Sequence, residues 1–62
     1  MIHLTRRERE VAVCLLLGLS SADMAARLLI SRRTIEDYRL QLLKKFEVTD
    51  TLRLVVKLWA TA

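Results

Sequence analysis

Proline is absent from this 62-residue sequence, and glycine and cysteine occur once each. This shortage excludes flexible linkers, low-complexity tracts and the usual turns of β-hairpins. Cys14 has no second cysteine for an intramolecular disulfide, and with one histidine, His3, it cannot supply a common zinc site. No internal repeat is visible. We therefore expect one all-helical domain, near the smallest size that an apolar core stabilises unaided.

Long hydrophobic runs are also missing. The longest uncharged stretch, residues 11–22, is too short to cross a bilayer. A signal peptide could be sought over residues 6–26, but Glu8 and Glu10 lie inside that segment and it has no small-residue cleavage site. The sequence therefore predicts a cytoplasmic protein without a membrane partner.

Catalytic constellations are lacking as well. His3 stands alone near a terminus, and the sequence shows no Ser/His/Asp set, no carboxylate pair of a catalytic kind and no phosphate-binding loop. We expect neither an enzyme nor a cofactor. Lysine and arginine outnumber aspartate and glutamate by eleven to seven, which gives a net charge of +4 and favours an anionic partner such as nucleic acid.

Helix starts are what the sequence does contain. Thr5 with Glu8 forms a capping box, preceded by Leu4 as a hydrophobic staple, and Ser20 with Asp23 repeats the box in a Ser/Asp version. Ser31 is a third N-cap, and Thr49 or Asp50 a fourth. These starts and the apolar periodicity predict a four-helix, bundle-like domain, with helices over about residues 5–17, 21–29, 32–46 and 50–60.

The second and third of these helices are separated by only a few apolar residues. Their starts lie eleven residues apart, so a tight turn must join them, as in a helix-turn-helix. Between Arg27 and Lys45 there are six basic and two acidic residues, which accounts for the whole net charge. The positive charge is therefore concentrated where the helix-turn-helix is expected.

Apolar spacing assigns a core face to each helix. The first contributes Val11, Cys14 and Leu15, while Val13 and Leu17 either complete an unusually buried helix or form a contact patch. The core members expected in the next two helices are Met24, Ala25 and Leu28, then Ile35, Tyr38 or Arg39, Leu42 and Phe46. The outward face of the helix over 32–46 then carries Arg33, Glu36, Asp37, Leu40, Gln41 and Lys44.

The last helix has two apolar stripes. Leu54, Val55 and Leu58 can serve the core, and Leu52, Val56 and Trp59 lie about 120° away. A second stripe of this kind is typical of a helix that packs outside its own domain, and a symmetric homodimer is the simplest partner. Ordinary exposure of apolar residues in a small domain remains the alternative.

Nearly the whole chain, residues 4–58, resembles the LuxR-type (GerE-like) DNA-binding domain of bacterial transcription regulators. The segments LTRREREV, GLSSADMAARLLIS, RRTIEDY and KKFEV occur in the family's order and spacing. The resemblance implies four helices, with the third in the major groove of double-stranded DNA and the fourth forming the dimer. Such domains are usually joined to an N-terminal receiver, as in response regulators, or to a ligand-sensing domain. The apolar patch of the first helix or the stripe of the fourth would then be a surface for that domain to cover.

The resemblance also implies individual contacts. Phosphate contacts are implied at Ser31, Thr34, Lys44 and Lys45, with Arg27, Arg32, Arg33 and the Tyr38 hydroxyl as further candidates. Base contacts are implied at Glu36, Asp37, Leu40 and Gln41, and Arg33 on the same face is expected to join them. Glutamate and aspartate can accept from cytosine N4, and leucine can touch the thymine methyl.

Three departures from the family pattern stand out. The first is the presence of two carboxylates, Glu36 and Asp37, on the base-contacting face. Phosphates repel them unless Arg32, Arg33 or Arg39 neutralises them. Glu47 replaces the glycine or asparagine that eases a left-handed helix end, which costs stability. Arg53 replaces the glutamate that closes the last capping box, so the fourth helix depends on Asp50.

Two other functions fit parts of the pattern. Region four of a sigma factor has a similar start and helix-turn-helix, but the short helix after Val48 belongs to the LuxR-type pattern. The second function is that of a protein-interaction module that keeps the fold but has lost DNA binding. Its support is the acidic pair Glu36 and Asp37 together with a hydrophobic content of 53%.

Overall fold

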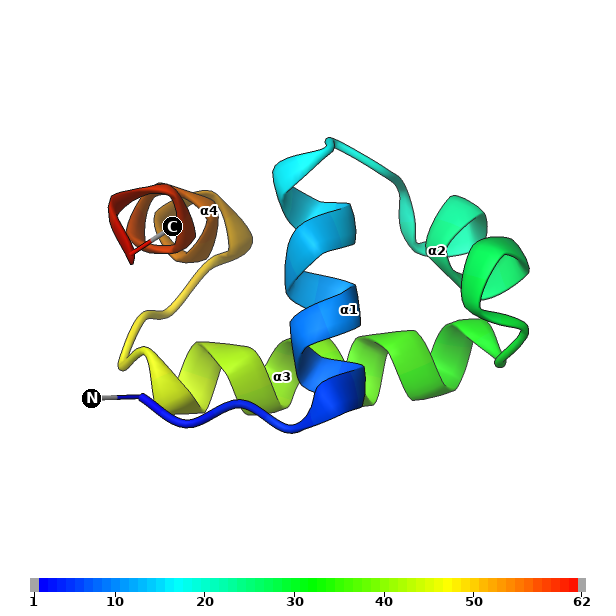
Figure 1. The fold of residues 1–62 in the computed structure, drawn as a ribbon, viewed down its shortest axis with the longest axis horizontal. Helices are drawn as coiled ribbons and strands as arrows, with labels where there is room; N and C mark the ends of the chain where they lie inside the picture. Colours follow the sequence, from blue (N-terminus) through cyan, green and yellow to red (C-terminus); the bar gives the residue numbers. More distant parts are fainter. Residues whose placement is uncertain (1, 62) are drawn as a thin grey trace.

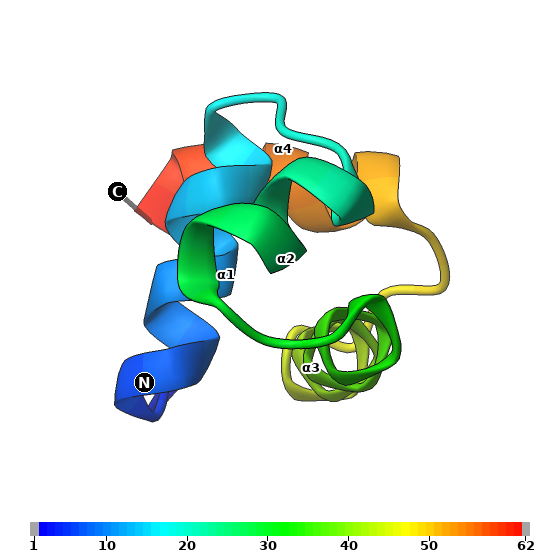
Figure 2. The same cartoon turned by 90° about the vertical axis from the view of Figure 1, so that its right-hand side faces the viewer.

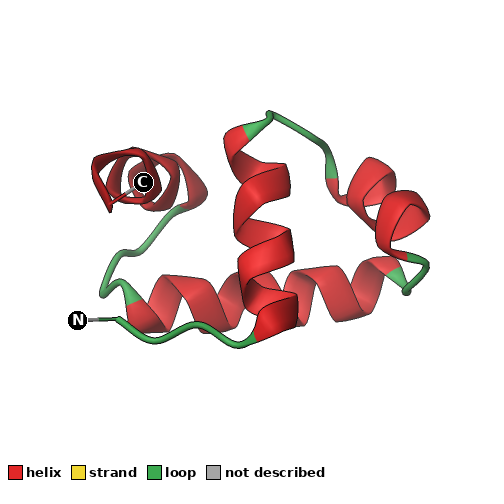
Figure 3. Ribbon diagram, in the orientation of Figure 1, coloured by secondary structure: helices red, strands yellow, loops and turns green. Residues whose placement is uncertain are grey.

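Four helices account for most of the computed structural model, which describes residues 2–61 (Figures 1 and 3). They are α1 (Arg6–Leu16), α2 (Ser21–Leu28), α3 (Arg32–Lys45) and α4 (Thr51–Thr61). The described residues contain no strand, so the expected all-helical fold is confirmed. Every boundary lies within one residue of the range expected from caps and periodicity. Over this part of the chain, no helix is both long and apolar enough to span a membrane.

Helix α3 lies along one side of the molecule, and the other helices cover it from the opposite side. In Figure 1, α1 stands across the middle of α3, with α2 above one end and α4 above the other. Figure 2 looks almost along α3 and shows α2 and α4 above it, with α1 above and beside it. One face of α3 is therefore covered along its length, while the opposite face is left open.

The helix starts are fixed by local hydrogen bonds. The Thr5 N–H donates to Glu8 Oε1 at 2.8 Å and the Glu8 N–H donates to Thr5 Oγ1 at 3.2 Å, which completes the capping box of α1. Ser20 Oγ accepts from the Asp23 N–H at 3.1 Å, but the reciprocal bond, from the Ser20 N–H to the Asp23 carboxylate, is not among the hydrogen bonds of residues 2–61. Asp50 accepts from the backbone N–H three residues later at 2.8 Å. The Ser20 box is thus half formed, and Asp50 caps α4 as expected.

The first three helices end in the same way, with a left-handed residue followed by an apolar one. The left-handed residues are Gly18 (φ 77°), Leu29 (φ 58°) and Glu47 (φ 56°). The apolar residues that follow them are Leu19, Ile30 and Val48, and all three pack against the core. In each case the N–H of the apolar residue donates to the carbonyl five residues earlier at 3.1 Å, which is the hydrogen bond of a Schellman motif. Helix α2 ends one residue before Leu29 because that residue turns left-handed. Without glycine, the conformation costs roughly 1–2 kcal/mol per residue.

The core takes one apolar stripe from each helix. Val11 of α1, Met24 of α2, Ile35 and Leu42 of α3 and Leu54 of α4 are each at most 2% exposed. The other buried apolar residues are Ala12, Cys14, Leu15, Phe46 and Leu58. The core face predicted for each helix is therefore confirmed, and Met24 fills space in the core.

Two apolar residues of α1 stay outside this core. Val13 is 49% exposed and Leu17 is 63% exposed. The sequence left two possibilities open, an unusually buried helix or a surface patch. The structure shows that Val13 and Leu17 form a surface patch. We call Val13 and Leu17 the α1 patch.

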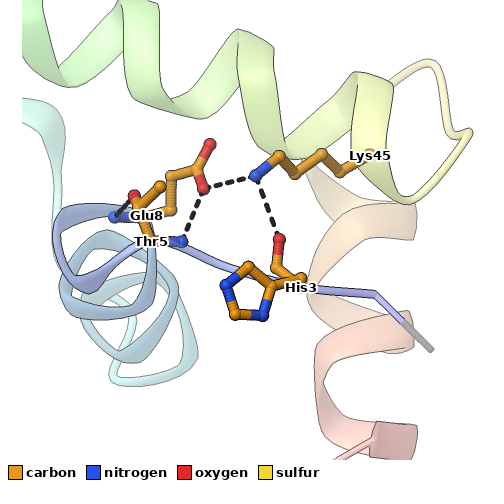
Figure 4. Close-up of polar contacts among 4 residues, drawn as sticks. All are labelled: His3, Thr5, Glu8 and Lys45. Carbon is orange, nitrogen blue, oxygen red and sulfur yellow. Dashed lines mark hydrogen bonds and ion pairs between the residues drawn. The ribbon is translucent and has the colours of Figure 1, made fainter.

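A buried ion pair fastens α1 to the end of α3. Glu8 is 5% exposed, and its Oε1 accepts from Lys45 Nζ at 2.6 Å (Figure 4). The same ammonium donates to the His3 carbonyl at 3.0 Å, which ties the N-terminal segment to α3. The hydrogen bond from Lys45 is the main cause that lowers the pKa of Glu8, with the Thr5 N–H adding to it and burial opposing it.

Leu29→Gly should stabilise the domain, because glycine adopts the left-handed conformation without strain and the leucine side chain, 88% exposed, buries little. The expected gain is about 1 kcal/mol. A gain of that size raises the thermal midpoint of a domain this small by about 4–8 °C. Thermal unfolding followed by circular dichroism measures it. Leu29→Ala is the matched control because it keeps the strain, and equal midpoints for the two variants would rule out strain at this position.

Lys45→Met should destabilise the domain by about 1.5–3 kcal/mol, because Glu8 stays buried without its cation. Since folding lowers the pKa of Glu8 from its ordinary 4.5, the pair stabilises fully above that pH and loses its effect as pH falls through the depressed pKa. Urea unfolding at several pH values should therefore show the difference from wild type narrowing in acid. The exposed neighbour supplies the control, since Lys44→Met should change stability little. If the difference in unfolding free energy between Lys45→Met and wild type did not change with pH, the ion pair would be excluded as its source.

Candidate nucleic-acid interface

Helices α2 and α3 are joined by a turn of three residues, 29–31, and form the expected helix-turn-helix. Ser31 Oγ accepts from the Thr34 N–H at 3.1 Å and lies 2.8 Å from Thr34 Oγ1. Both hydroxyls, expected from the family resemblance to contact phosphates, thus take part in the cap of α3. They stand at the helix N-terminus, where backbone N–H groups favour a nearby anion.

The open face of α3 carries an exposed stripe of side chains. Its members are Arg33, Asp37, Leu40, Gln41 and Lys44, which recur at the spacing of one helix face. All are exposed, and Leu40, a large apolar residue, is 54% exposed. We call these residues the recognition stripe. It includes every residue expected to contact bases except Glu36.

The recognition stripe offers one group for each kind of base edge in the major groove. Arg33 presents the forked donor that suits guanine, and Gln41 the paired donor and acceptor that suits adenine. Asp37 can accept from cytosine N4, and Leu40 can contact the thymine methyl. With Lys44, the stripe has two cations against one carboxylate, so its charge suits an approach to phosphates.

Glu36 departs from the outward position that the sequence suggested. Its Oε1 accepts from Ser21 Oγ of α2 at 2.6 Å, and its Oε2 pairs with Arg39 one turn further along α3. The hydrogen bond from Ser21 is the main cause that lowers the pKa of Glu36, with burial opposing it and Arg39 and Arg32 adding to the effect. The Glu36 side chain is 43% exposed, but its carboxylate is paired with α2 and with Arg39 on the flank of α3 and does not stand free beside Asp37.

Arg39 extends this contact to α4. Its NH1 group donates to Thr51 Oγ1 at 3.2 Å, while its NH2 group pairs with Glu36. The sequence predicts Arg39 as one of the arginines that could neutralise Glu36, because the two residues are three positions apart on one helix. Ser21 and Thr51 were not identified, because they lie 15 and 12 residues from their partners and meet them only when the helices pack.

Of the phosphate-contact candidates, Ser31 and Thr34 cap α3 and Arg33 lies in the recognition stripe, and the remaining five fall into two groups. Arg32 and Lys44 are exposed near opposite ends of α3. The other three lie elsewhere: Lys45 pairs with Glu8, Tyr38 packs against the core, and Arg27 is exposed beside the α1 patch in a shallow groove between α1 and α2. The structure therefore does not gather all the expected phosphate contacts along the recognition stripe.

Helix α4 presents its second apolar stripe to solvent. Leu52 is 76% exposed, Val56 61% and Trp59 62%, and we call these three residues the α4 stripe. Leu52 and Val56 line a shallow depression together with Val48 of the preceding turn. Because Leu54 and Leu58 fill the core from the opposite side, the α4 stripe has no packing role within the domain.

Comparison with known proteins agrees with this arrangement. No curated protein and no solved structure matches the chain significantly. A family model does match, over residues 3–58: that of the bacterial regulatory proteins of the luxR family. The matched residues include all of α1, α2 and α3 and most of α4, and so contain the helix-turn-helix and the recognition stripe. The chain therefore belongs to the luxR family of bacterial regulatory proteins, as a DNA-binding helix-turn-helix domain.

Proposed function

We propose that this chain recognises specific sequences in double-stranded DNA by placing α3 in the major groove, and that it regulates transcription in the bacterial cytoplasm. The observation that carries the proposal is the recognition stripe on the open face of α3. An α-helix is about 10–12 Å in diameter and fits a major groove about 12 Å wide, and the 14 residues of α3 extend about 21 Å along it. Because α1, α2 and α4 all lie on the other side of α3, they leave room for the duplex (Figures 1 and 2).

Affinity and specificity come from different residues in this proposal. Lys44 and Arg32 neutralise phosphates, with Ser31 and Thr34 close to the backbone at the start of α3. The bases are contacted by Arg33, Asp37, Leu40 and Gln41. Lys45 contributes mainly through the ion pair with Glu8, since its ammonium already has two acceptors. Phosphate contacts fix the position of the helix, and base contacts select the sequence.

Two copies would bind together through the α4 stripe. Leu52, Val56 and Trp59 are exposed on one face of α4, and an aromatic residue among aliphatic ones is typical of an interface core. A twofold dimer presents two copies of α3 to two half-sites, so the proposed target is a repeat of half-sites.

An interaction module without DNA binding is the alternative from another functional class. Its main support was the acidic pair on the base-contacting face. The structure weakens that support, because Glu36 is engaged with Ser21 and Arg39 and only Asp37 remains in the recognition stripe. Binding of duplex DNA at low salt distinguishes the two functions.

Lys44→Ala should weaken binding to all duplexes alike, and the slope of log K against log salt should become less steep by about one. Leu40→Ala should instead change the preference at particular base pairs. Fluorescence anisotropy with random and selected duplexes over a salt series measures both effects. Lys45→Met is the control and should change the slope less than Lys44→Ala. If the wild-type domain binds little duplex even at low salt, the interaction module is the better explanation.

Val56→Asp should prevent self-association, because a charge at the centre of the α4 stripe would be buried unpaired in the dimer. Sedimentation should then show a monomer, and affinity for a duplex with two half-sites should fall while affinity for one half-site changes little. Val13→Asp is the matched control, since it places the same substitution on the exposed α1 patch. Equal effects of the two variants, or a monomeric wild type at high concentration and on DNA, would exclude dimerisation through α4.

A further inference from the structure

Glu36 is an unusual residue to find next to a DNA-contacting surface. It immediately precedes Asp37 of the recognition stripe, and on a helix it projects about 60° to one side of Arg33. A carboxylate that swung toward the open face of α3 would meet the phosphates of a bound duplex. Since hydrogen bonding lowers its pKa, Glu36 is ionised at neutral pH, and protonation does not remove its charge.

Both oxygens of this carboxylate are occupied. Oε1 accepts from Ser21 Oγ at 2.6 Å, and Oε2 pairs with the Arg39 guanidinium. Ser21 is the first residue of α2, and Thr51, which accepts from Arg39 at 3.2 Å, is the first residue of α4. The contacts therefore run from α2 across one flank of α3 to α4.

We propose that Ser21 and Arg39 are positioning residues that hold the Glu36 carboxylate against α2, away from the phosphates of bound DNA. Arg39 also neutralises the charge, and Thr51 fixes the guanidinium where it can do so. This inference rests on the proposed function, because it concerns how the domain approaches DNA. Its consequence is that an uncharged change at Ser21, outside the recognition stripe, alters DNA affinity through the charge of Glu36.

A double-mutant cycle tests this inference. The variants are Ser21→Ala, Glu36→Gln and the two together, and the probe is a random-sequence duplex in fluorescence anisotropy at low and moderate salt. Ser21→Ala should weaken binding roughly twofold to fivefold at low salt, because the carboxylate is then held by Arg39 alone and can move nearer to a phosphate, and less at moderate salt. Glu36→Gln alone should not weaken binding. In the Glu36→Gln background, Ser21→Ala should have no further effect.

Two controls separate positioning from a general loss of structure. Ser20→Ala removes the N-cap hydroxyl of the same helix without touching Glu36, so its effect on affinity should be the same with Glu36 or Gln at position 36. Thr51→Val removes the acceptor for Arg39 without changing any charge, and its effect on affinity should also disappear in the Glu36→Gln background. Circular dichroism at the binding temperature establishes that each variant is folded.

The outcomes are distinguishable. If Ser21→Ala weakens DNA binding equally in both backgrounds, or not at all in the wild-type background, the positioning role is excluded while the DNA-binding function stands. If the wild-type domain itself fails to bind the duplex at low salt, both the proposed function and this inference are wrong. Loss of the Ser21→Ala effect on replacing Glu36 supports the inference.

Discussion

The burial of one face of α3 is the constraint on which the rest of the structure depends. Ile35 and Leu42, two turns apart on this helix, are fully buried, and the residues around them come from α1, α2 and α4. A helix of 14 residues that buries one side against three others must expose the opposite side. The core therefore settles which residues of α3 can meet a partner, and the recognition stripe is the complement of the core stripe.

Charge is distributed along α3 by the same packing. Glu8 with Lys45 and Glu36 with Arg39 are paired at the edges of the covered face, whereas Arg33, Asp37 and Lys44 stay exposed on the open face. Buried or half-buried charges need partners because desolvation is costly, so pairing follows burial. A count of basic residues overstates the charge available to an anion, since two of the cations in this region are already neutralised.

The parts of the fold that depend on neighbouring residues could be predicted from the sequence. Caps such as Thr5, Ser31 and Asp50 act over three residues, and periodicity identifies the core face, so boundaries and core followed from local rules. The roles of Glu36 and Lys45 could not be predicted, because their partners Ser21 and Glu8 lie 15 and 37 residues away. The resemblance to the family gave the expected position of the base-contacting face but not which of its charges are already paired.

The three Schellman ends, at Gly18, Leu29 and Glu47, have a consequence for how such a domain can evolve. Every hydrogen bond that stops these helices is formed by backbone atoms within five residues, and the side chains that help are apolar residues turned toward the core. No side chain of the recognition stripe takes part, and Lys44 contributes only its backbone carbonyl. In the proposed function, substitutions there change the preferred DNA sequence without moving the start or end of α3, so new specificities are accessible through single mutations that leave the scaffold intact.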